Sequence, residues 1–120
     1  MADQVQERRV HPRLEFTANA TLFTADGKIV DASSGNLSAG GALVDSAARV
    51  DPGSRVFFDI QLQHARRQLH IRGCALVAHS EALESGEGRV HRSGLQFLDM
   101  DSLSRATLDR VLAFNGVGAT

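Results

Sequence analysis

The sequence predicts an all-β domain with one helix: a six-stranded antiparallel β-barrel followed by a C-terminal α-helix. Two observations carry this prediction. Apolar residues alternate with polar ones through most of the chain, which is the period of half-buried strands. Turn signals rich in Gly, Pro, Asp and Asn separate these segments, and only the last segment changes to helical spacing. Short strands separated by turns favour a closed barrel, because closure removes exposed strand edges.

The chain begins with a polar and charged segment, residues 1–13. Pro12 disfavours helix at the residue before it, because that residue is pushed toward extended geometry. We therefore expect a flexible basic N-terminal arm over 1–13. A single barrel domain with its helix is expected over 14–120, since a chain of 120 residues suits one domain with one core.

The strands expected in the first half of the domain are 14–22, 28–33 and 42–44. The second strand follows Asp26-Gly27, which is a hairpin signal because both residues tolerate positive φ. A turn over 36–41 is expected before the third strand. The strands expected in the second half are 56–62, 69–77 and 89–98. Gly94 lies inside the last strand, which predicts a bulge or a close backbone approach.

The C-terminal segment has the spacing of a helix, expected over about 101–115. Asp101 or Ser102 can cap it. The positions that follow helical spacing are Leu103, Thr107, Val111 and Phe114, with Leu108 and Leu112 beside them. The six phenylalanines are interpreted as core residues. The exception is Phe57, which alternation places on the opposite face, where it packs under the helix or forms a partner surface.

Composition limits the classes of function. The net charge of −1 argues against general nucleic-acid binding, so any site for an anion must be a local patch. A single cysteine excludes an internal disulfide and favours a reducing compartment. No apolar run approaches the roughly 20 residues that span a membrane, and the N-terminus has no signal-peptide core. We expect a cytoplasmic monomer that does not insert into membranes.

The first candidate site segment is Arg8-Arg9-Val10-His11-Pro12-Arg13. Arginine presents a planar fork of donors that pairs with guanine O6 and N7 or with phosphate oxygens. Residues four apart in an extended strand point to the same side, so Arg9 and Arg13 can hold one ligand while Arg8 faces elsewhere. A solubilising basic tail is the alternative interpretation.

The second candidate site segment is Asn36-Leu37-Ser38-Ala39-Gly40-Gly41. These are common turn residues, so a plain hairpin turn is the alternative interpretation. As a site, Asn36 bonds a base edge and Ser38 a phosphate, while Gly40 and Gly41 let the backbone approach the ligand closely. Together the two segments predict a site for a small, multiply charged ligand that contains bases.

No metal or catalytic site is predicted. The five histidines have no metal-ligand spacing with carboxylates or with the cysteine. Cys74 is interpreted as a small packing residue. The serines lack a recognisable base and orienting group, so no nucleophile can be named and an enzyme is not expected.

The two motifs resemble those of the PilZ domain family. Arg-x-x-x-Arg (Arg9, Arg13) precedes the first strand, and Asn-x-Ser-x-x-Gly (Asn36, Ser38, Gly41) follows the second. The likeness extends to the segment over 94–99 before the helix. It implies a six-stranded barrel that binds cyclic di-GMP, a bacterial second messenger, with no resident cofactor and no DNA or RNA partner. It also implies that Arg9 and Arg13 contact guanines and phosphates, and that Asn36 and Ser38 add contacts.

Two further positions follow from the resemblance. An arginine at the position of Arg8 accompanies binding of a stacked ligand dimer in the family, so two ligand molecules per chain are expected. Some relatives place an aromatic residue near Val77 to His79, where it stacks on guanine. This chain has no Trp or Tyr. His79 or an arginine is left to stack, which predicts a lower affinity.

The leading hypothesis is a receptor for cyclic di-GMP in which the ligand orders the N-terminal arm and an effector protein reads the change. Motility, adhesion and exopolysaccharide or biofilm output are the processes that the family implies. The alternative is a module of the same fold that contacts another protein and does not bind the nucleotide. A barrel that binds single-stranded nucleic acid fits less well, because aromatic residues make up only 5% of the chain.

Overall fold

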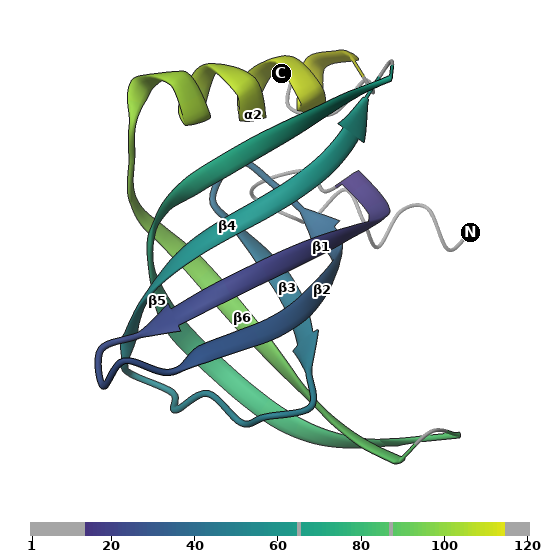
Figure 1. Ribbon diagram of the computed structural model, residues 1–120, viewed down its shortest axis with the longest axis vertical. Helices are drawn as coiled ribbons and strands as arrows, with labels where there is room; N and C mark the ends of the chain where they lie inside the picture. Colours follow the sequence, from purple (N-terminus) through teal and green to yellow (C-terminus); the bar gives the residue numbers. More distant parts are fainter. Residues whose placement is uncertain (1–13, 65, 87, 115–120) are drawn as a thin grey trace, which may run out of the picture.

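A computed structural model describes residues 14–64, 66–86 and 88–114, so Arg8, Arg9 and Arg13 lie outside the described residues. Six antiparallel strands close into a barrel in the order β1-β2-β3-β6-β5-β4, and one helix follows them (Figure 1). The predicted fold class is therefore confirmed. The elements are β1 (Leu14–Thr24), β2 (Ile29–Leu37), β3 (Gly41–Ser46), β4 (Arg55–His64), β5 (Arg67–Ser85), β6 (Gly88–Met100) and α2 (Ser102–Phe114).

The turns fall where glycine permits them. Gly27 and Gly53 have φ of 88° and 85°, a region that residues other than glycine rarely enter, and both lie between predicted strands. β5 is longer than expected, because residues beyond Val77 continue to pair with β6. This extension pairs with neither β3 nor β4 over its last residues and leaves the barrel as a two-stranded ribbon. Both of its faces meet solvent, so it lacks the alternation that marks a half-buried strand.

The second strand also runs further than the sequence predicted. Residues 36–41 were expected to form a turn, but Asn36 and Leu37 belong to β2 and Gly41 begins β3. The turn itself is restricted to residues 38–40. The pairing of β2 with β3 shifts register between Ser34 and Asn36. Because this bulge interrupts the alternation of inward and outward residues, a strict period of two does not identify the last residues of β2.

The core fills the barrel and the space beneath α2, which lies across one end of the barrel (Figure 1). Phe58 is 2% exposed, and its ring stacks on that of Phe97 with centroids 4.9 Å apart. Leu108, Val111 and Leu112 bury one face of the helix. The predicted helix is confirmed, but its predicted apolar face is wrong at both ends, since Leu103 and Phe114 are 76% and 73% exposed.

Ser104 explains why the helix turns a different face inward. Its hydroxyl accepts the backbone N–H of Arg72 in β5 at 3.0 Å and donates to the Asp101 carboxylate at 3.2 Å. Ser104 is therefore buried against the barrel, where the helical spacing predicted Leu103. Asp101 is the cap, because its Oδ1 accepts the backbone N–H of Ser104 at 2.7 Å. That hydrogen bond lowers the pKa of Asp101.

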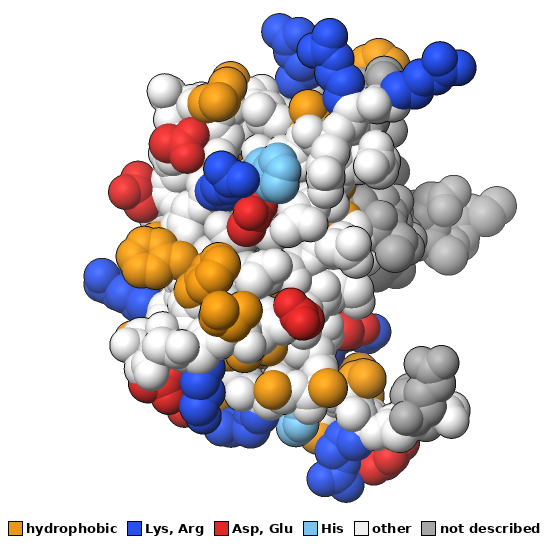
Figure 2. All heavy atoms as spheres, viewed as in Figure 1, with side chains coloured by type: hydrophobic (Ala, Val, Ile, Leu, Met, Phe, Trp, Pro, Cys, Tyr) orange, Lys and Arg blue, Asp and Glu red, His pale blue; other side chains and the backbone are white. Residues whose placement is uncertain are grey.

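Three large apolar side chains form a row on the outside of the barrel. Phe23 of β1 is paired with Ile29 of β2 on one side and with Phe57 of β4 on the other. Paired residues project from the same face, and these three are 40%, 68% and 65% exposed. Figure 2 shows hydrophobic side chains gathered where β1 ends and β2 and β4 begin. Phe57 lies on the outer face as alternation predicted, and its exposure excludes the alternative of packing under the helix, whereas placing Phe23 and Phe114 in the core was wrong. We call Phe23, Ile29 and Phe57 the apolar row.

Candidate ligand-binding site

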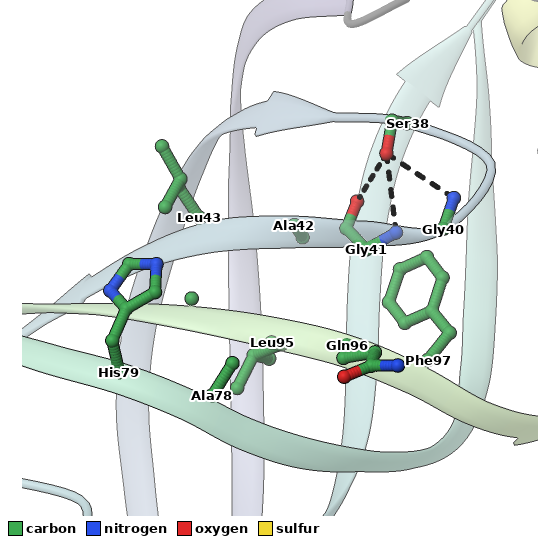
Figure 3. A pocket seen from close by; sticks show the side chains of 11 residues that line it. Ser38, Gly40, Gly41, Ala42, Leu43, Ala78, His79, Leu95, Gln96 and Phe97 are labelled. Carbon is green, nitrogen blue, oxygen red and sulfur yellow. Dashed lines mark hydrogen bonds between the residues drawn. The ribbon is translucent and has the colours of Figure 1, made fainter. Parts of the chain in front are cut away.

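A cavity of about 500 Å³ lies on the side of the barrel formed by β3, β6 and β5. Its walls are Ser38 with residues 40–43, Ala78 with His79, and Gly94 to Phe97. Ser38, the loop glycines and Phe97 stand at one end, and His79 and Leu43 at the other (Figure 3). The fold therefore gathers Ser38, Gly40, Gly41 and His79 around one hollow. Val77 does not reach it, because its side chain is fully buried in the core.

Ser38 closes the loop between β2 and β3. Its Oγ accepts the backbone N–H groups of Gly40 and Gly41, each at 3.2 Å, and donates to the Gly41 carbonyl at 3.3 Å. The backbone N–H of Ser38 donates to the same carbonyl at 2.9 Å. These bonds are drawn in Figure 3 for the hydroxyl. With its hydroxyl engaged and only 6% of the residue exposed, Ser38 fixes the shape of the cavity wall.

Gly41 and Gly40 bring this loop against β6. A Cβ on Gly41 would lie 2.1 Å from the backbone oxygen of Leu95, which leaves no room for any side chain. The Gly40 carbonyl accepts the backbone N–H of Phe97 at 2.9 Å. The sequence predicted a close approach of backbone to ligand at these glycines, and the close neighbour that the structure shows is the strand beside them.

Arg105 ties the loop to the helix, and sequence reasoning did not find it. Its guanidinium donates to the carbonyl of Ala39 at 3.1 Å across 66 residues of sequence. Gln96 was also missed. It is exposed, lines the cavity and pairs with Gly41. Gln96 could have been identified from its outward-facing position in the strand alternation. No local sequence pattern predicts the contact of Arg105 with Ala39.

Asn36 lies beside the main cavity. It lines a smaller hollow of about 190 Å³ together with Gly35, Leu43, Asp45 and Arg92, and Leu43 lines both hollows. The Asn36 Oδ1 is buried and has no hydrogen-bond partner among the described residues. An acceptor left without a donor costs about 1–3 kcal/mol, so this oxygen is suited to receive a donor.

The described side chains around the site carry no unpaired negative charge. Among the described residues that line the main cavity none is acidic, and His79 is the single titratable side chain. In the smaller hollow, Arg92 makes two hydrogen bonds to Asp45 at 2.8 and 3.0 Å. This pairing raises the pKa of Arg92 and neutralises the carboxylate. None of the described residues that line the main cavity therefore repels phosphate.

The described part of the chain has neither a candidate metal cluster nor a candidate membrane-spanning helix. Within residues 14–64, 66–86 and 88–114 no group of three or more His, Cys, Asp or Glu side chains could hold a metal ion. No helix in these ranges is both long enough and apolar enough to cross a membrane.

Comparison with known proteins places the chain in a family. The profile of the PilZ domain matches residues 7–114, nearly the whole chain. The protein belongs to the PilZ domain family. The matched segment begins ahead of Arg8 and includes both motifs. Among curated proteins, no sequence matches this chain significantly.

Solved structures of PilZ proteins share this fold at low sequence identity. The Bacillus subtilis inhibitor of motility MotI (DgrA) superposes with a TM-score of 0.73 at 19% identity, over 91% of this chain and 51% of its own. The PilZ domain of Escherichia coli YcgR with c-di-GMP has a TM-score of 0.66 at 16% identity, over 89% and 90%. Longer YcgR in complex with c-di-GMP has a TM-score of 0.69 at 17% identity, over 91% and 46%. This chain thus spans about half the length of MotI and of that YcgR.

Proposed function

We propose that this PilZ domain protein is a non-catalytic receptor for cyclic di-GMP and passes the signal to an effector protein. One observation carries the proposal. The motif residues Ser38, Gly40 and Gly41 form a hydrogen-bonded wall of a cavity whose described lining residues include no carboxylate, and the Asn36 Oδ1 is buried beside it without a partner among the described residues. Membership of the PilZ family and likeness to c-di-GMP complexes of YcgR support the choice of ligand.

The ligand's chemistry fits these groups. Cyclic di-GMP carries two phosphodiester anions and two guanines, whose N–H groups are hydrogen-bond donors. If the Asn36 side chain turns toward the ligand, its Oδ1 can accept a guanine N–H, which would remove the cost of its unpaired burial. Gln96 adds an exposed amide on the opposite wall. The cavity lacks a cationic partner for the phosphates among its described neutral walls, so the phosphates require one from elsewhere.

The arginines of the N-terminal arm are the proposed cations. Leu14 of β1 pairs with Leu37 of β2, which immediately precedes Ser38. The arm therefore joins the barrel at the edge of the site, within reach of it. We propose that Arg9 and Arg13 bind guanine edges and phosphates, and that Arg8 allows a second ligand molecule.

Ordering of the arm over the ligand is the proposed signal. It would change the shape and charge of this side of the barrel, and an effector protein would bind the changed surface. We expect the protein to act as a cytoplasmic monomer in the control of motility or biofilm formation. MotI, the inhibitor of motility, is a structural neighbour with about twice this chain's length.

Calorimetric titration with cyclic di-GMP tests the proposal. Arg9→Ala and Arg13→Ala should each weaken binding about fivefold or more, because each removes a bidentate contact worth about 1–3 kcal/mol. Arg8→Ala should lower the number of ligands bound. Arg110→Ala, on the exposed side of α2, is the matched control and should bind as the wild type does. No heat at high micromolar ligand would refute the receptor function.

The apolar row favours one second candidate, an interaction module that works without the nucleotide. Exposed apolar side chains on three neighbouring strands are typical of protein contacts. Complementation of a strain that lacks the gene separates the two functions. A receptor requires Arg9 and Arg13 for its activity in the cell. An interaction module loses activity with Phe57→Ser and keeps it with both arginines replaced.

A further inference from the structure

A bulge in β5 aims His79 at the cavity. Val77 pairs with Leu95 of β6 and His79 pairs with Gly94, so Ala78 is an extra residue with no partner. If Ala78 paired with Gly94 in an unbroken alternation, His79 would project to the same side as Val77, into the core. Val77 is fully buried, whereas Ala78 and His79 are both exposed and both line the cavity. The bulge therefore serves to turn the imidazole outward.

The His79 ring packs on Gly94, and we call this glycine the seat of the ring. A Cβ added to Gly94 would lie 2.3 Å from Nε2, 2.7 Å from Cε1 and 2.8 Å from Cδ2. These are the distances of a point above the ring plane near Nε2, not of a point beyond its edge. The ring therefore lies with one face on the bare backbone of β6, next to Leu43 of β3 (Figure 3). Any side chain at position 94 would displace it.

The charged groups near His79 lie on the three strands that carry it, and two of them, Arg92 and Asp45, form an ion pair. Glu81 follows on β5 and is paired with Arg92 of β6, whose guanidinium bonds Asp45 of β3. Nearer to the ring, on the same three strands, the cavity walls offer Leu43, Gly94 and the neutral amide of Gln96. His79 thus provides the one ionisable side chain with which the described part of the cavity can meet a ligand.

The family resemblance already implies a ligand contact at His79; beyond that contact, we propose that protonation of this imidazole strengthens the binding. This inference rests on the proposed function. Histidine is the side chain that changes charge between pH 5 and 8. As imidazolium it donates to a phosphate oxygen or to guanine O6 or N7, and cyclic di-GMP itself has no group that titrates in this range. Affinity therefore rises as the pH falls from 8 to 6, with uptake of a proton on binding.

Calorimetry at pH 6, 7 and 8, in two buffers of different ionisation enthalpy, measures both the affinity and the protons taken up. The wild-type affinity should increase about tenfold from pH 8 to pH 6, the size expected for one charge-assisted hydrogen bond. His79→Gln should bind with a flat pH profile. His70→Gln is the control, because His70 bonds Asp59 at 2.9 Å away from the cavity and should leave the profile unchanged. His11→Gln serves as the control for the arm.

A double-substitution cycle tests the seat. Gly94→Ala should displace the ring and reduce affinity at pH 6 as much as His79→Ala does. In the His79→Ala background, Gly94→Ala should cost nothing further, because the ring that it displaces is already gone. Binding with a flat wild-type profile, or a pH dependence that survives in His79→Gln, would overturn the inference. Absence of binding at every pH would refute the proposed function and this inference with it.

Discussion

The two sides of the barrel carry different side chains at their outward-facing strand positions. On β3, β6 and β5, outward positions hold small residues such as Gly41, Ala78 and Gly94, and the surface is hollow there. On β2, β1 and β4, outward positions hold the large and exposed side chains of the apolar row (Figure 2). The size of the outward side chains thus separates a side suited to a small molecule from a side suited to a protein.

The two sides also differ in how they are held. The cavity wall over residues 38–41 is fixed by the Ser38 hydroxyl, by β6 and by Arg105 of α2. The apolar row has strand pairing behind it, and its side chains extend into solvent. Substitutions should therefore affect stability strongly on the cavity side and weakly on the apolar row.

Gly41→Ala should have the largest effect. The new methyl group would meet the Leu95 carbonyl at 2.1 Å, and strand backbone cannot move aside without breaking the pairing of β3 with β6. We expect a loss of about 2–3 kcal/mol in the free energy of unfolding, measured by urea denaturation. Gly86→Ala is the control, because a Cβ there meets open space. Equal stability of the two variants would contradict the account of the wall.

Ser38→Ala comes next. It leaves the N–H groups of Gly40 and Gly41 without their acceptor, at a cost of about 1–2 kcal/mol in stability. The affinity for cyclic di-GMP should fall as well, because the loop loses its fixed shape. Ser33→Ala, at an exposed position of β2, should change neither quantity. A stable Ser38→Ala variant that binds as the wild type does would show that the loop keeps its conformation without the Ser38 hydroxyl.

Arg105→Ala should cost about 1 kcal/mol, because it removes one partly buried hydrogen bond to the Ala39 carbonyl. The loss should be visible as a lower urea midpoint and as faster amide exchange at Gly40. Arg110→Ala, on the same helix but exposed, provides the comparison and should stay within about 0.5 kcal/mol of the wild type.

Phe57→Ser should have the smallest effect on the isolated protein. The side chain is 65% exposed, so its removal should change stability by about 0.5 kcal/mol or less. Ligand affinity should not change, because Phe57 lies on β4, outside the cavity walls. A large loss of stability would mean that the apolar row belongs to the core.

The sequence predicted the elements better than their ends. Alternation and glycine turns identified six strands, and Asp101 marked the start of the helix. The end of β2 was not predicted, because a bulge interrupts its alternation of apolar and polar residues. The full length of β5 was not predicted, because its last residues meet solvent on both faces and show no such alternation. The buried face of α2 was misplaced because a hydrogen-bonded serine, Ser104, turns inward.

For the site, the sequence identified the local motif over residues 36–41, which lines the two hollows. It did not identify the residues elsewhere in the chain that contact this motif. Contacts such as that of Arg105 with Ala39 join residues far apart in the chain and leave no local pattern. The packing of His79 on Gly94 depends on a bulge whose register the alternation of β5 alone does not fix.

Chemical-shift mapping by NMR tests the central claim most directly. Titration of the ¹⁵N-labelled protein with cyclic di-GMP should shift the amides of residues 38–43, His79 and Gly94 to Phe97 in one saturable process. The amides of Phe23, Ile29 and Phe57 should stay in place. Shifts confined to the apolar row, or no shifts at millimolar ligand, would contradict the assignment of this cavity as the nucleotide site.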